Sequence, residues 1–537
     1  MATGGGCRSL GLKCRRTINK LFLNKIRYYC NQNVPNYVVD EAKWKSVVGL
    51  EIHAQISSHS KLFSRSSTEF AALPNSRVSF FDAALPGTLP VLNRSCVESA
   101  VLTALALGCT VHKVSLFDRK HYFYVDLPAG YQITQQRKPI ATDGKLEFVV
   151  YNSAVYKSPF LCSSHIKQLQ LEQDSGRSLH DIDDGRTLID LNRAGIGLME
   201  IVFEPDLRNG EEAAGLIREL QKILQCLGTC SGYMNEGAMR IDANISVNRP
   251  GEPMGIRTEL KNINSARYVA NAIDFEIKRQ IRLLEAGENI KNETRKYDHV
   301  IKETVLMREK ENVQDYRYMP EPNLPPLRLY DDSDKENFKL TLDTINIDRL
   351  RENIPLLPAD ERKYLIEKYN LPLRSTLLLM NEGLQELFKE VSTGIKCNTK
   401  FVSHILLTDI LSQLNKRKLK TSEILISTDR IQEYIEMIDN KIVTSAKAKD
   451  VLQLMFDGDS RFPIEIVQAN NWTMISDLED LKKLCSEVIK NNPNLVKKYQ
   501  NGKSKFLSTL VNEVKKTSEN RANVQLVEEI LISMLNS

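Results

Sequence analysis

Several segments of the chain alternate apolar and polar residues with a period of two, which predicts strands with one apolar and one polar face. The clearest are 47–53, 166–174 and 240–247. In the second segment, Lys167 falls on the apolar side. Oxygen-rich polar faces with carboxylates suit hard cations such as magnesium. The polar faces carry Glu51, His53, Gln168, Gln170, Glu172, Asp174, Arg240, Asp242, Asn244 and Ser246.

Further segments extend this pattern and add cationic groups. They are 190–195 with Arg193, 198–206 with Glu200, and 256–261 with Arg257, Glu259 and Lys261 on one side. A cation site, arginines and Lys261 on one sheet face would bind and neutralise phosphate groups. A water-facing sheet of mixed charge would show the same residues, and the sequence alone leaves both interpretations open.

Helical periodicity appears twice within this strand-rich part and dominates after about residue 340. Residues 211–227 carry a leucine stripe and end at Gly228, a favourable C-cap, and residues 266–284 carry a second apolar stripe. A proline-rich exit at 319–329 leads to a polar connector at 330–335. The predicted fold class is α+β, with a mixed or antiparallel sheet domain at 40–340, a helical domain at 341–460 and a small helical tail at 461–537.

Charge is distributed unevenly along the 537 residues, whose formal net charge is +5. Residues 1–39 hold seven basic residues and no acidic one, and without them 66 basic residues face 68 acidic residues. A basic, acid-free N-terminus with interspersed leucine, isoleucine and phenylalanine is typical of a mitochondrial presequence. A basic arm that contacts RNA is the alternative.

Composition excludes other classes of protein and site. No apolar run approaches the roughly 18–20 residues that span a bilayer, so no membrane partner is predicted. The ten cysteines are scattered without a Cys-x-x-Cys pair, which indicates free thiols in a reducing compartment. The run Gly4–Gly6 is not a phosphate loop, because no Gly-Lys-Ser/Thr follows at the required spacing.

Short strings in a fixed order, from about residue 45 to the C-terminus, resemble the B-subunit family of glutamyl-tRNA(Gln) amidotransferases. One string alone is weak evidence, but many in the same order over most of the chain are specific. The strings lie at 47–53, 85–93, 117–120, 122–124, 126–128, 130–133, 200–202, 307–311 and 315–318.

The resemblance implies an activity, cofactors and partners. These enzymes convert glutamate mischarged on tRNA(Gln) into glutamine, and the B subunit phosphorylates the esterified glutamate with ATP. The amidase, which is the A subunit, makes ammonia from glutamine, and this ammonia then displaces the phosphate. A small C subunit holds the A and B subunits together and completes the heterotrimer. The chain shows no amidase-type serine cluster, so the ammonia is expected from the partner. The expected location is the mitochondrial matrix.

The resemblance also implies roles for the residues of the polar faces. The expected magnesium ligands are Glu51, His53, Glu172 and Glu200. The expected catalytic residues are Glu51, His53, Glu172, Arg240 and Lys261. The residues expected to bind ATP are Arg193, Asp242, Asn244, Arg257 and Glu259. His53 has a second interpretation as a hydrogen-bonded strand residue, and its i,i+2 spacing from Glu51 favours the metal.

The chain departs from the common bacterial pattern of the family at two places. Gln170 and Gln173 stand where many bacterial relatives have histidine and glutamate, which leaves the ligand count open; by the alternation Gln173 faces the apolar side. Four positions of a cysteine zinc site carried by some relatives are also changed, and without thiolates no structural zinc is expected. They read Ser64, Ser66, Ser79 and Asp82.

The last helical module resembles the family's tRNA-binding tail, although it departs from the bacterial pattern at Asn512 and at 519–520. Lys503, Lys505 and Arg521 are candidates for contacts with the tRNA backbone. The alternative to an enzyme subunit is a tRNA-binding scaffold that has lost its chemistry and only assembles the complex.

Overall fold

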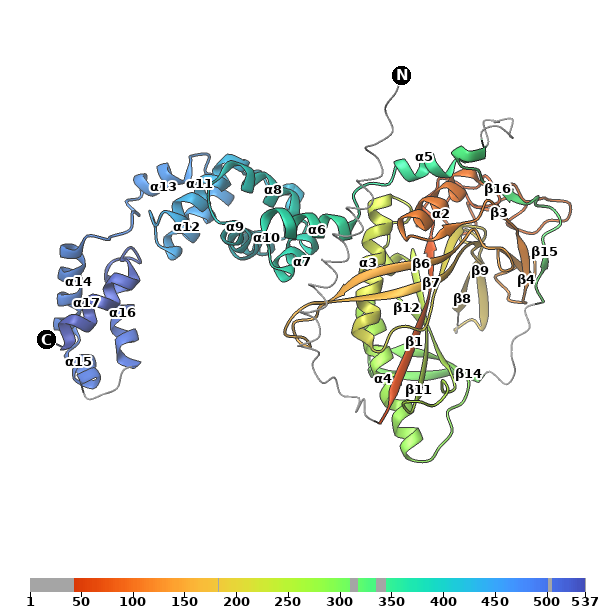
Figure 1. Cartoon of the computed structure of the whole chain (residues 1–537), viewed down its shortest axis with the longest axis horizontal. Coiled ribbons are helices and arrows are strands. Elements are labelled where there is room, and N and C mark those ends of the chain that lie inside the picture. Colours follow the sequence, from red (N-terminus) through yellow and green to blue (C-terminus); the bar gives the residue numbers. More distant parts are fainter. Residues whose placement is uncertain (1–42, 182, 310–316, 335–343, 501–504, 537) are drawn as a thin grey trace, which may run out of the picture. The chain divides into compact units, whose positions relative to one another are not determined.

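The computed structural model describes residues 43–181, 183–309, 317–334, 344–500 and 505–536. The predicted presequence 1–39 and the predicted domain limit at 340 therefore lie outside the described residues, as does Lys503. The chain divides into two compact units, Met1–Glu361 and Arg362–Ser537 (Figure 1).

A nine-stranded sheet forms the centre of the first unit, in the order β14-β13-β12-β11-β1-β10-β7-β6-β2. Neighbouring strands are antiparallel except β12 and β13, which are parallel. The mixed sheet, followed by helices in the second unit, confirms the predicted α+β class. The strands are β1 (Lys45–Gln55), β2 (Thr110–Val111), β6 (Ala141–Val150), β7 (Phe160–Gln173), β10 (Gly197–Phe203), β11 (Met239–Asn248), β12 (Thr258–Ile263), β13 (Glu293–Asp298) and β14 (Glu303–Glu309).

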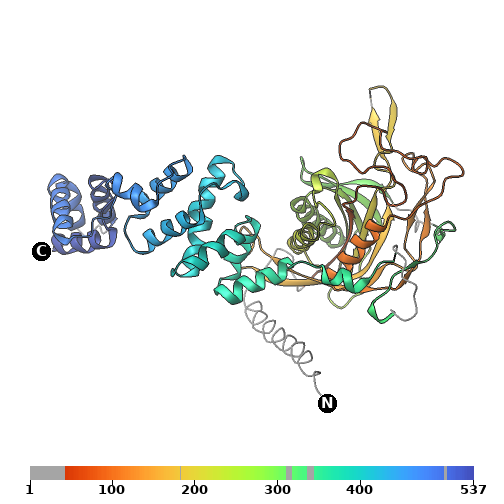
Figure 2. The same cartoon turned by 90° about the horizontal axis from the view of Figure 1, so that it is seen from above.

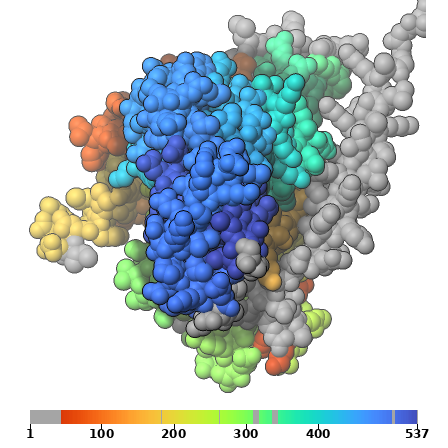
Figure 3. Space-filling model, turned by 90° about the vertical axis from the view of Figure 1, so that its left-hand side faces the viewer, coloured from red at the N-terminus to blue at the C-terminus, as the bar shows by residue number. Residues whose placement is uncertain are grey.

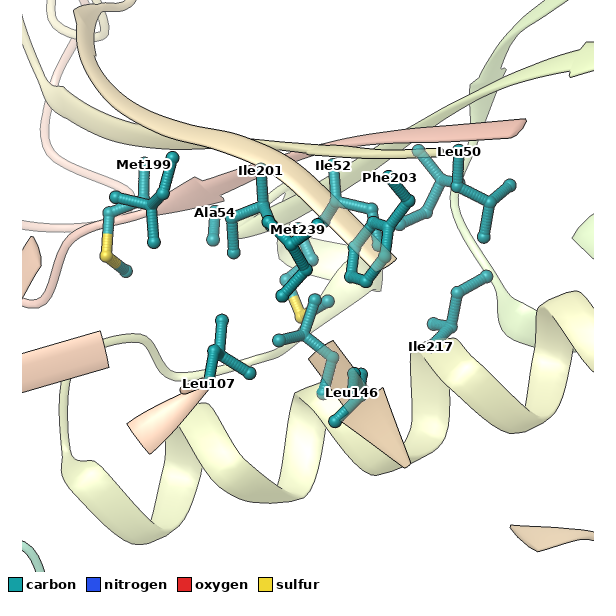
Figure 4. Close-up of a cluster of buried hydrophobic side chains, with 14 of the residues drawn as sticks. Leu50, Ile52, Ala54, Leu107, Leu146, Met199, Ile201, Phe203, Ile217 and Met239 are labelled. Carbon is teal, nitrogen blue, oxygen red and sulfur yellow. The ribbon is translucent and has the colours of Figure 1, made fainter. Parts of the chain in front are cut away.

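Helices cover one face of this sheet, as Figure 1 shows for α3 and α4. Both were predicted from their apolar stripes, and Gly228 ends α3 with a φ of 69°, a left-handed C-cap that glycine adopts without a Cβ clash. Figure 4 shows sheet residues such as Ile52 and Ile201 on the side that faces Ile217 of α3. The helices are α2 (Arg94–Ala106), α3 (Gly210–Leu227) and α4 (Ala266–Glu285).

Smaller strands extend the first unit. The proline-rich exit at 319–329 contains two of them, β15 and β16. The β8–β9 hairpin protrudes from the unit, coloured yellow in Figure 2. The short sheets are β15-β4-β5 (Met319–Pro320, Asp118–His121, Tyr131–Thr134), β16-β3 (Leu327–Arg328, Val114–Ser115) and β8-β9 (Arg177–Asp181, Arg186–Asp190). The first unit also has the 3₁₀ helices η1 (Met234–Glu236) and η2 (Asp332–Asp334) and the helix α5 (Ile347–Glu352).

The second unit is helical throughout its described residues, and Figure 3 shows its surface in cyan to blue. It has two hydrophobic clusters, and α13 adds Ile466 and Val467 to the first of them. The domain limit near 460 stays a prediction. The helices are α6 (Pro358–Tyr369, across the unit limit), α7 (Leu373–Asn381), α8 (Gln385–Gly394), α9 (Thr399–Ile405), η3 (Leu406–Ile410), α10 (Leu411–Arg417), η4 (Thr421–Glu423), α11 (Thr428–Asp439), α12 (Ser445–Phe456), α13 (Pro463–Ala469), α14 (Leu478–Asn491), α15 (Pro493–Gln500), α16 (Lys505–Thr517) and α17 (Val524–Asn536).

Candidate functional site

The face of the nine-stranded sheet opposite the helices is polar, because the alternating residues of β1, β7, β10 and β11 are in register there. His53 lies between Glu200 of β10 and Arg240 of β11, and Glu200 lies opposite Gln170 of β7. Each strand keeps its apolar residues on the helix-covered side, so the core fixes which side chains meet on the other.

A cavity of about 1100 Å³ lies over this face. All the residues predicted from the sequence for catalysis, ATP or metal line it, which the alternation alone could not establish for residues from five separate strands and two loops. They are Glu51, His53, Glu172, Arg193, Glu200, Arg240, Asp242, Asn244, Arg257, Glu259 and Lys261. Their individual roles remain predictions.

Three of the four expected metal ligands form one group. One ligand atom each from Glu51, His53 and Glu200 lies within 4.8 Å of the others, and His53 Nε2 is 3.9 Å from Glu51 Oε1. Glu172 lines the same cavity but stands outside this group, with its Oε2 3.6 Å from Nζ of Lys120. Two carboxylates and an imidazole are a donor set that fits a divalent cation.

The pKa values of two carboxyl groups in this cluster, Glu51 and Glu200, are shifted in opposite directions. Burial, then the charge of Glu172 and the hydrogen bond with Glu51, raises the pKa of Glu200 well above its usual range. Burial alone would also raise the pKa of Glu51, but the hydrogen bond with Glu200 and the charge of His53 lower it to about 2. Each of two close carboxylates disfavours ionisation of the other, so one of the two pKa values rises. A divalent ion at this cluster would favour the ionised form of both carboxylates.

Gln170 takes part in this cluster through its amide nitrogen. Its Nε2 donates to Glu200 Oε2 and, at 3.1 Å, to Thr134 Oγ1, while its Oε1 accepts from Gln168 Nε2 at 2.7 Å. Gln173 points to the other side, where its Oε1 accepts from the backbone nitrogen of Ile133. Gln170 therefore holds a carboxylate in position, and its own carbonyl oxygen is already hydrogen-bonded.

Cationic side chains surround the cluster. Arg240 and Arg193 share Asp174, whose Oδ2 lies 2.8 Å from Arg240 Nη2 and 3.6 Å from Arg193 Nε. Arg240 Nε is buried and has no hydrogen-bond partner among the described residues. Lys261 Nζ lies 3.0 Å from Asp242 and 3.3 Å from Glu259. This arrangement keeps cations beside the cavity, oriented by carboxylates, as binding of phosphate oxygens requires.

Two lysines of the cavity differ from the prediction. Lys120 was not predicted as a site residue, and Lys167 was predicted on the apolar face of its strand but lines the cavity. Burial would lower the pKa of Lys120, but the charges of Glu172 and Glu200 raise it well above its usual range, so the residue is a cation inside the site. Lys120 comes from β4 of a separate short sheet. The string 117–120 resembles the family, but nothing in it predicts a role for Lys120. Lys167 lines the cavity because a bulge in β7 sets two of its residues against one of β10 near Val202, which interrupts the alternation.

Two smaller differences concern strand limits. Strand β12 begins at Thr258, so Arg257 precedes the strand that was predicted from residue 256. Strand β9 ends at Asp190, so Arg193 lies in the loop that leads to β10. Both arginines nevertheless line the cavity.

The four positions without cysteine form a hydrogen-bonded loop around a buried ion pair. Lys61 Nζ lies 3.1 Å from Asp82 Oδ2, which also accepts from Ser64 Oγ at 3.1 Å and from the nitrogen of Ser79 at 2.9 Å. Lys61 also donates to the carbonyl of Leu191 at 3.3 Å. The pair therefore ties this loop to the segment that carries Arg193.

The helical tail offers less support for an RNA surface. Lys505 is exposed at the start of α16. Arg521 is half-buried and donates from Nη1 to the carbonyl of Asn471 at 3.1 Å. Arg521 thus has a structural contact whether or not it contacts RNA. Among the helices of the described residues, none has an apolar stretch sufficient to span a bilayer.

Comparisons with known proteins show which family the chain resembles. Residues 46–334 match the family model of the GatB/GatE catalytic domain, and residues 386–535 match that of the GatB domain. The chain is 49% identical to the human mitochondrial B subunit of glutamyl-tRNA(Gln) amidotransferase, over 92% of its own length and 89% of that relative. It is 48% identical to the Aedes aegypti protein of the same name, over 92% of the chain and 93% of the relative. The B subunit of the Rickettsia rickettsii aspartyl/glutamyl-tRNA(Asn/Gln) amidotransferase is 42% identical, over 92% of the chain and 98% of the relative.

Proposed function

The chain belongs to the GatB/GatE family, and on that premise we propose that it converts glutamate on tRNA(Gln) into glutamine with ATP. The observation that carries the proposal is the convergence of the metal-binding, cationic and amide groups on one cavity of the sheet. Relatives named as the B subunit of an amidotransferase support the same assignment.

The reaction takes two steps because a carboxylate is anionic and has no good leaving group. An oxygen of the glutamate side chain attacks the γ-phosphorus of ATP, ADP leaves, and an acyl phosphate forms. Ammonia then attacks the carbonyl carbon, phosphate leaves, and the nitrogen loses a proton. The departing phosphate is itself a base and can receive that proton. In the first step, catalysis depends mainly on positioning and charge neutralisation.

The side chains of the site divide these tasks. Glu51, His53 and Glu200, with Glu172 beside them, would hold magnesium, which when bound neutralises charge on the phosphate oxygens. Around that group, cationic side chains would hold phosphate oxygens, and the remaining polar side chains would orient these cations. The assigned residues are Arg193, Arg240, Arg257 and Lys261 as the cations, and Asp242, Asn244 and Glu259 as the orienting groups.

Partners and location complete the proposal. A protein that acts as the B subunit requires the amidase, or A subunit, to supply ammonia, and the small C subunit, together with glutamyl-tRNA(Gln). The animal relatives are named mitochondrial, and the basic, acid-free segment 1–39 supports import into the matrix.

ATP hydrolysis that depends on glutamyl-tRNA(Gln) tests the proposal directly in the assembled complex. Glu51→Ala and Glu172→Ala are each expected to abolish formation of the glutamyl phosphate while the glutaminase partner still assembles. Glu147→Ala, which removes an exposed carboxylate of β6 that lines neither the cavity nor its rim, is the matched control. Wild-type phosphorylation in both site variants would overturn the assignment.

The scaffold alternative gains little from the geometry. It rested on Gln170 and Gln173, yet Gln173 faces away from the cluster and Gln170 supports Glu200 by a hydrogen bond. The same assay separates the two functions, because a scaffold would bind glutamyl-tRNA(Gln) without hydrolysing ATP.

A further inference from the structure

A second cavity of about 330 Å³ adjoins the main one. We call it the side slot and define it by Gly49, Val202, Pro205, Asn244 and Met254. Its walls are mainly apolar, in contrast to the charged main cavity. The two cavities share Glu51, Lys167, Val202, Asn244 and Arg257.

The slot exists because one position on the polar face of β1 has no side chain. Gly49 shares the face of Glu51 and pairs with Asn244 of β11. A Cβ at Gly49 would lie 3.5 Å from Cα and Cβ of Pro205, an ordinary van der Waals contact, and no positive φ demands glycine there. The fold therefore tolerates a side chain at this position, and a large one would fill the slot.

Asn244, which lines both cavities, has one side-chain atom without a partner among the described residues. Oδ1 of Asn244 is buried and has no hydrogen-bond partner among the described residues. A buried acceptor without a donor is unfavourable and is usually satisfied by a ligand or water. An asparagine side chain in an apolar slot can hydrogen-bond the amine and a ring nitrogen of adenine, as it does with adenine in nucleic acids.

We propose that the side slot binds an adenine ring, with Asn244 recognising its amine and Pro205 and Met254 contacting the ring. This inference rests on the proposed function, which brings two adenines to the site, that of ATP and that of the terminal adenosine to which glutamate is esterified. Glu51 lines both cavities, and Lys167 and Arg257 stand at their common rim. A base in the slot thus places its ribose and phosphates toward the Glu51–His53–Glu200 group.

Gly49→Leu fills the slot and leaves every cationic residue of the site unsubstituted. Binding to the full chain, assembled with its partner subunits, is measured for MgATP, for magnesium tripolyphosphate and for glutamyl-tRNA(Gln). We expect MgATP to bind about tenfold or more weakly, because the ring loses its apolar contacts, and tripolyphosphate to bind unchanged. Lys45→Leu, an exposed position at the start of the same strand that lines neither cavity, is the control.

The outcomes separate the sources of the adenine and the two proposals. Weaker MgATP binding assigns the slot to ATP, and weaker glutamyl-tRNA(Gln) binding with unchanged MgATP assigns it to the terminal adenosine; both support an adenine site. Unchanged binding of both, or equal weakening of MgATP and tripolyphosphate, overturns it. A wild-type complex that binds neither MgATP nor tripolyphosphate overturns the proposed function instead.

A second variant covers the case in which Gly49→Leu does not fold. Asn244→Leu keeps the approximate volume and removes the amide, so it is expected to reduce the preference for the adenine nucleotide over MgGTP several-fold. An unchanged preference between MgATP and MgGTP in a folded Asn244→Leu variant contradicts the role given to Asn244.

Discussion

The buried pair of Lys61 and Asp82 yields a prediction whose size follows from its surroundings. The two side chains are 0% and 1% exposed, and their N–O distance is 3.1 Å. Asp82→Asn leaves the charge of Lys61 buried without its counter-ion, a change that costs about 3–5 kcal/mol of unfolding free energy. For a unit of this size, the loss corresponds to a fall on the order of 10 °C in the unfolding temperature.

A double-mutant cycle separates the pair from its parts. Lys61→Met alone leaves Asp82 with Ser64 and the nitrogen of Ser79 as donors, and the double variant Lys61→Met/Asp82→Asn leaves no buried charge. We therefore expect the double variant to be more stable than Asp82→Asn, although it carries one more substitution. Thermal unfolding of the full chain, followed by circular dichroism, measures all four proteins.

The dependence on pH gives a second measurement on the same variants. Burial lowers the pKa of Lys61, and Asp82 opposes that change. Because the folded pKa is lowered, the unfolded chain binds more protons between the folded pKa and the usual lysine range, so stability rises with pH in that window. Without Asp82 the lowering is larger, and Asp82→Asn should gain stability from a lower pH onward. Lys61→Met should lose this dependence.

Two results would refute this reasoning. If Asp82→Asn unfolds at the wild-type temperature, the pair does not hold the loop. If elemental analysis finds about one zinc per chain, a metal stabilises the loop in spite of the missing thiolates.

Three further predictions concern the metal, the N-terminus and the tail. Glu200 has a raised pKa, so protons should compete with magnesium for this carboxylate and the calorimetric affinity for magnesium should fall as the pH is lowered; a Glu200→Gln variant that keeps the full wild-type dependence would contradict it. A reporter fused to residues 1–39 should reach the mitochondrial matrix, and a cytosolic reporter would favour an RNA-binding arm. Neutralising Lys503, Lys505 and Arg521 together should weaken tRNA binding and flatten its salt dependence without changing turnover at saturating tRNA; an unchanged salt slope would leave the tail as a structural or docking module.

The alternation of side chains allowed much of the site to be predicted, because in a sheet the same periodicity fixes both the core and the opposite face. The alternation identified Glu51, His53, Glu200 and Arg240 as residues of polar strand faces. The pairing of β1 with β10 and β11 then brings these residues together. Lys167 could not be placed, since the bulge depends on how β7 meets β10 and not on the composition of either strand.

Neither Lys120 as a site residue nor the side slot could be predicted from the sequence, for a different reason. Lys120 reaches the cluster from a four-residue strand of another sheet, and a strand that short has too few residues to show a period. The slot depends on what is missing at Gly49 and on Pro205 beside it, which are far apart in the chain and meet only in the fold.

The position of β1 in the sheet has a consequence for how the protein folds as it is synthesised. This strand is made first among those of the sheet, yet it lies in the middle, between strands 197–203 and 239–248. The apolar residues of β1, including Val48, Leu50 and Ile52, are buried in the folded chain. They therefore stay exposed to solvent during synthesis until both of these later strands have been made. Contacts between such distant parts of a chain slow folding and expose the nascent chain to aggregation. We expect correct folding of the protein during synthesis to depend on chaperones that bind β1 until β11 has emerged from the ribosome.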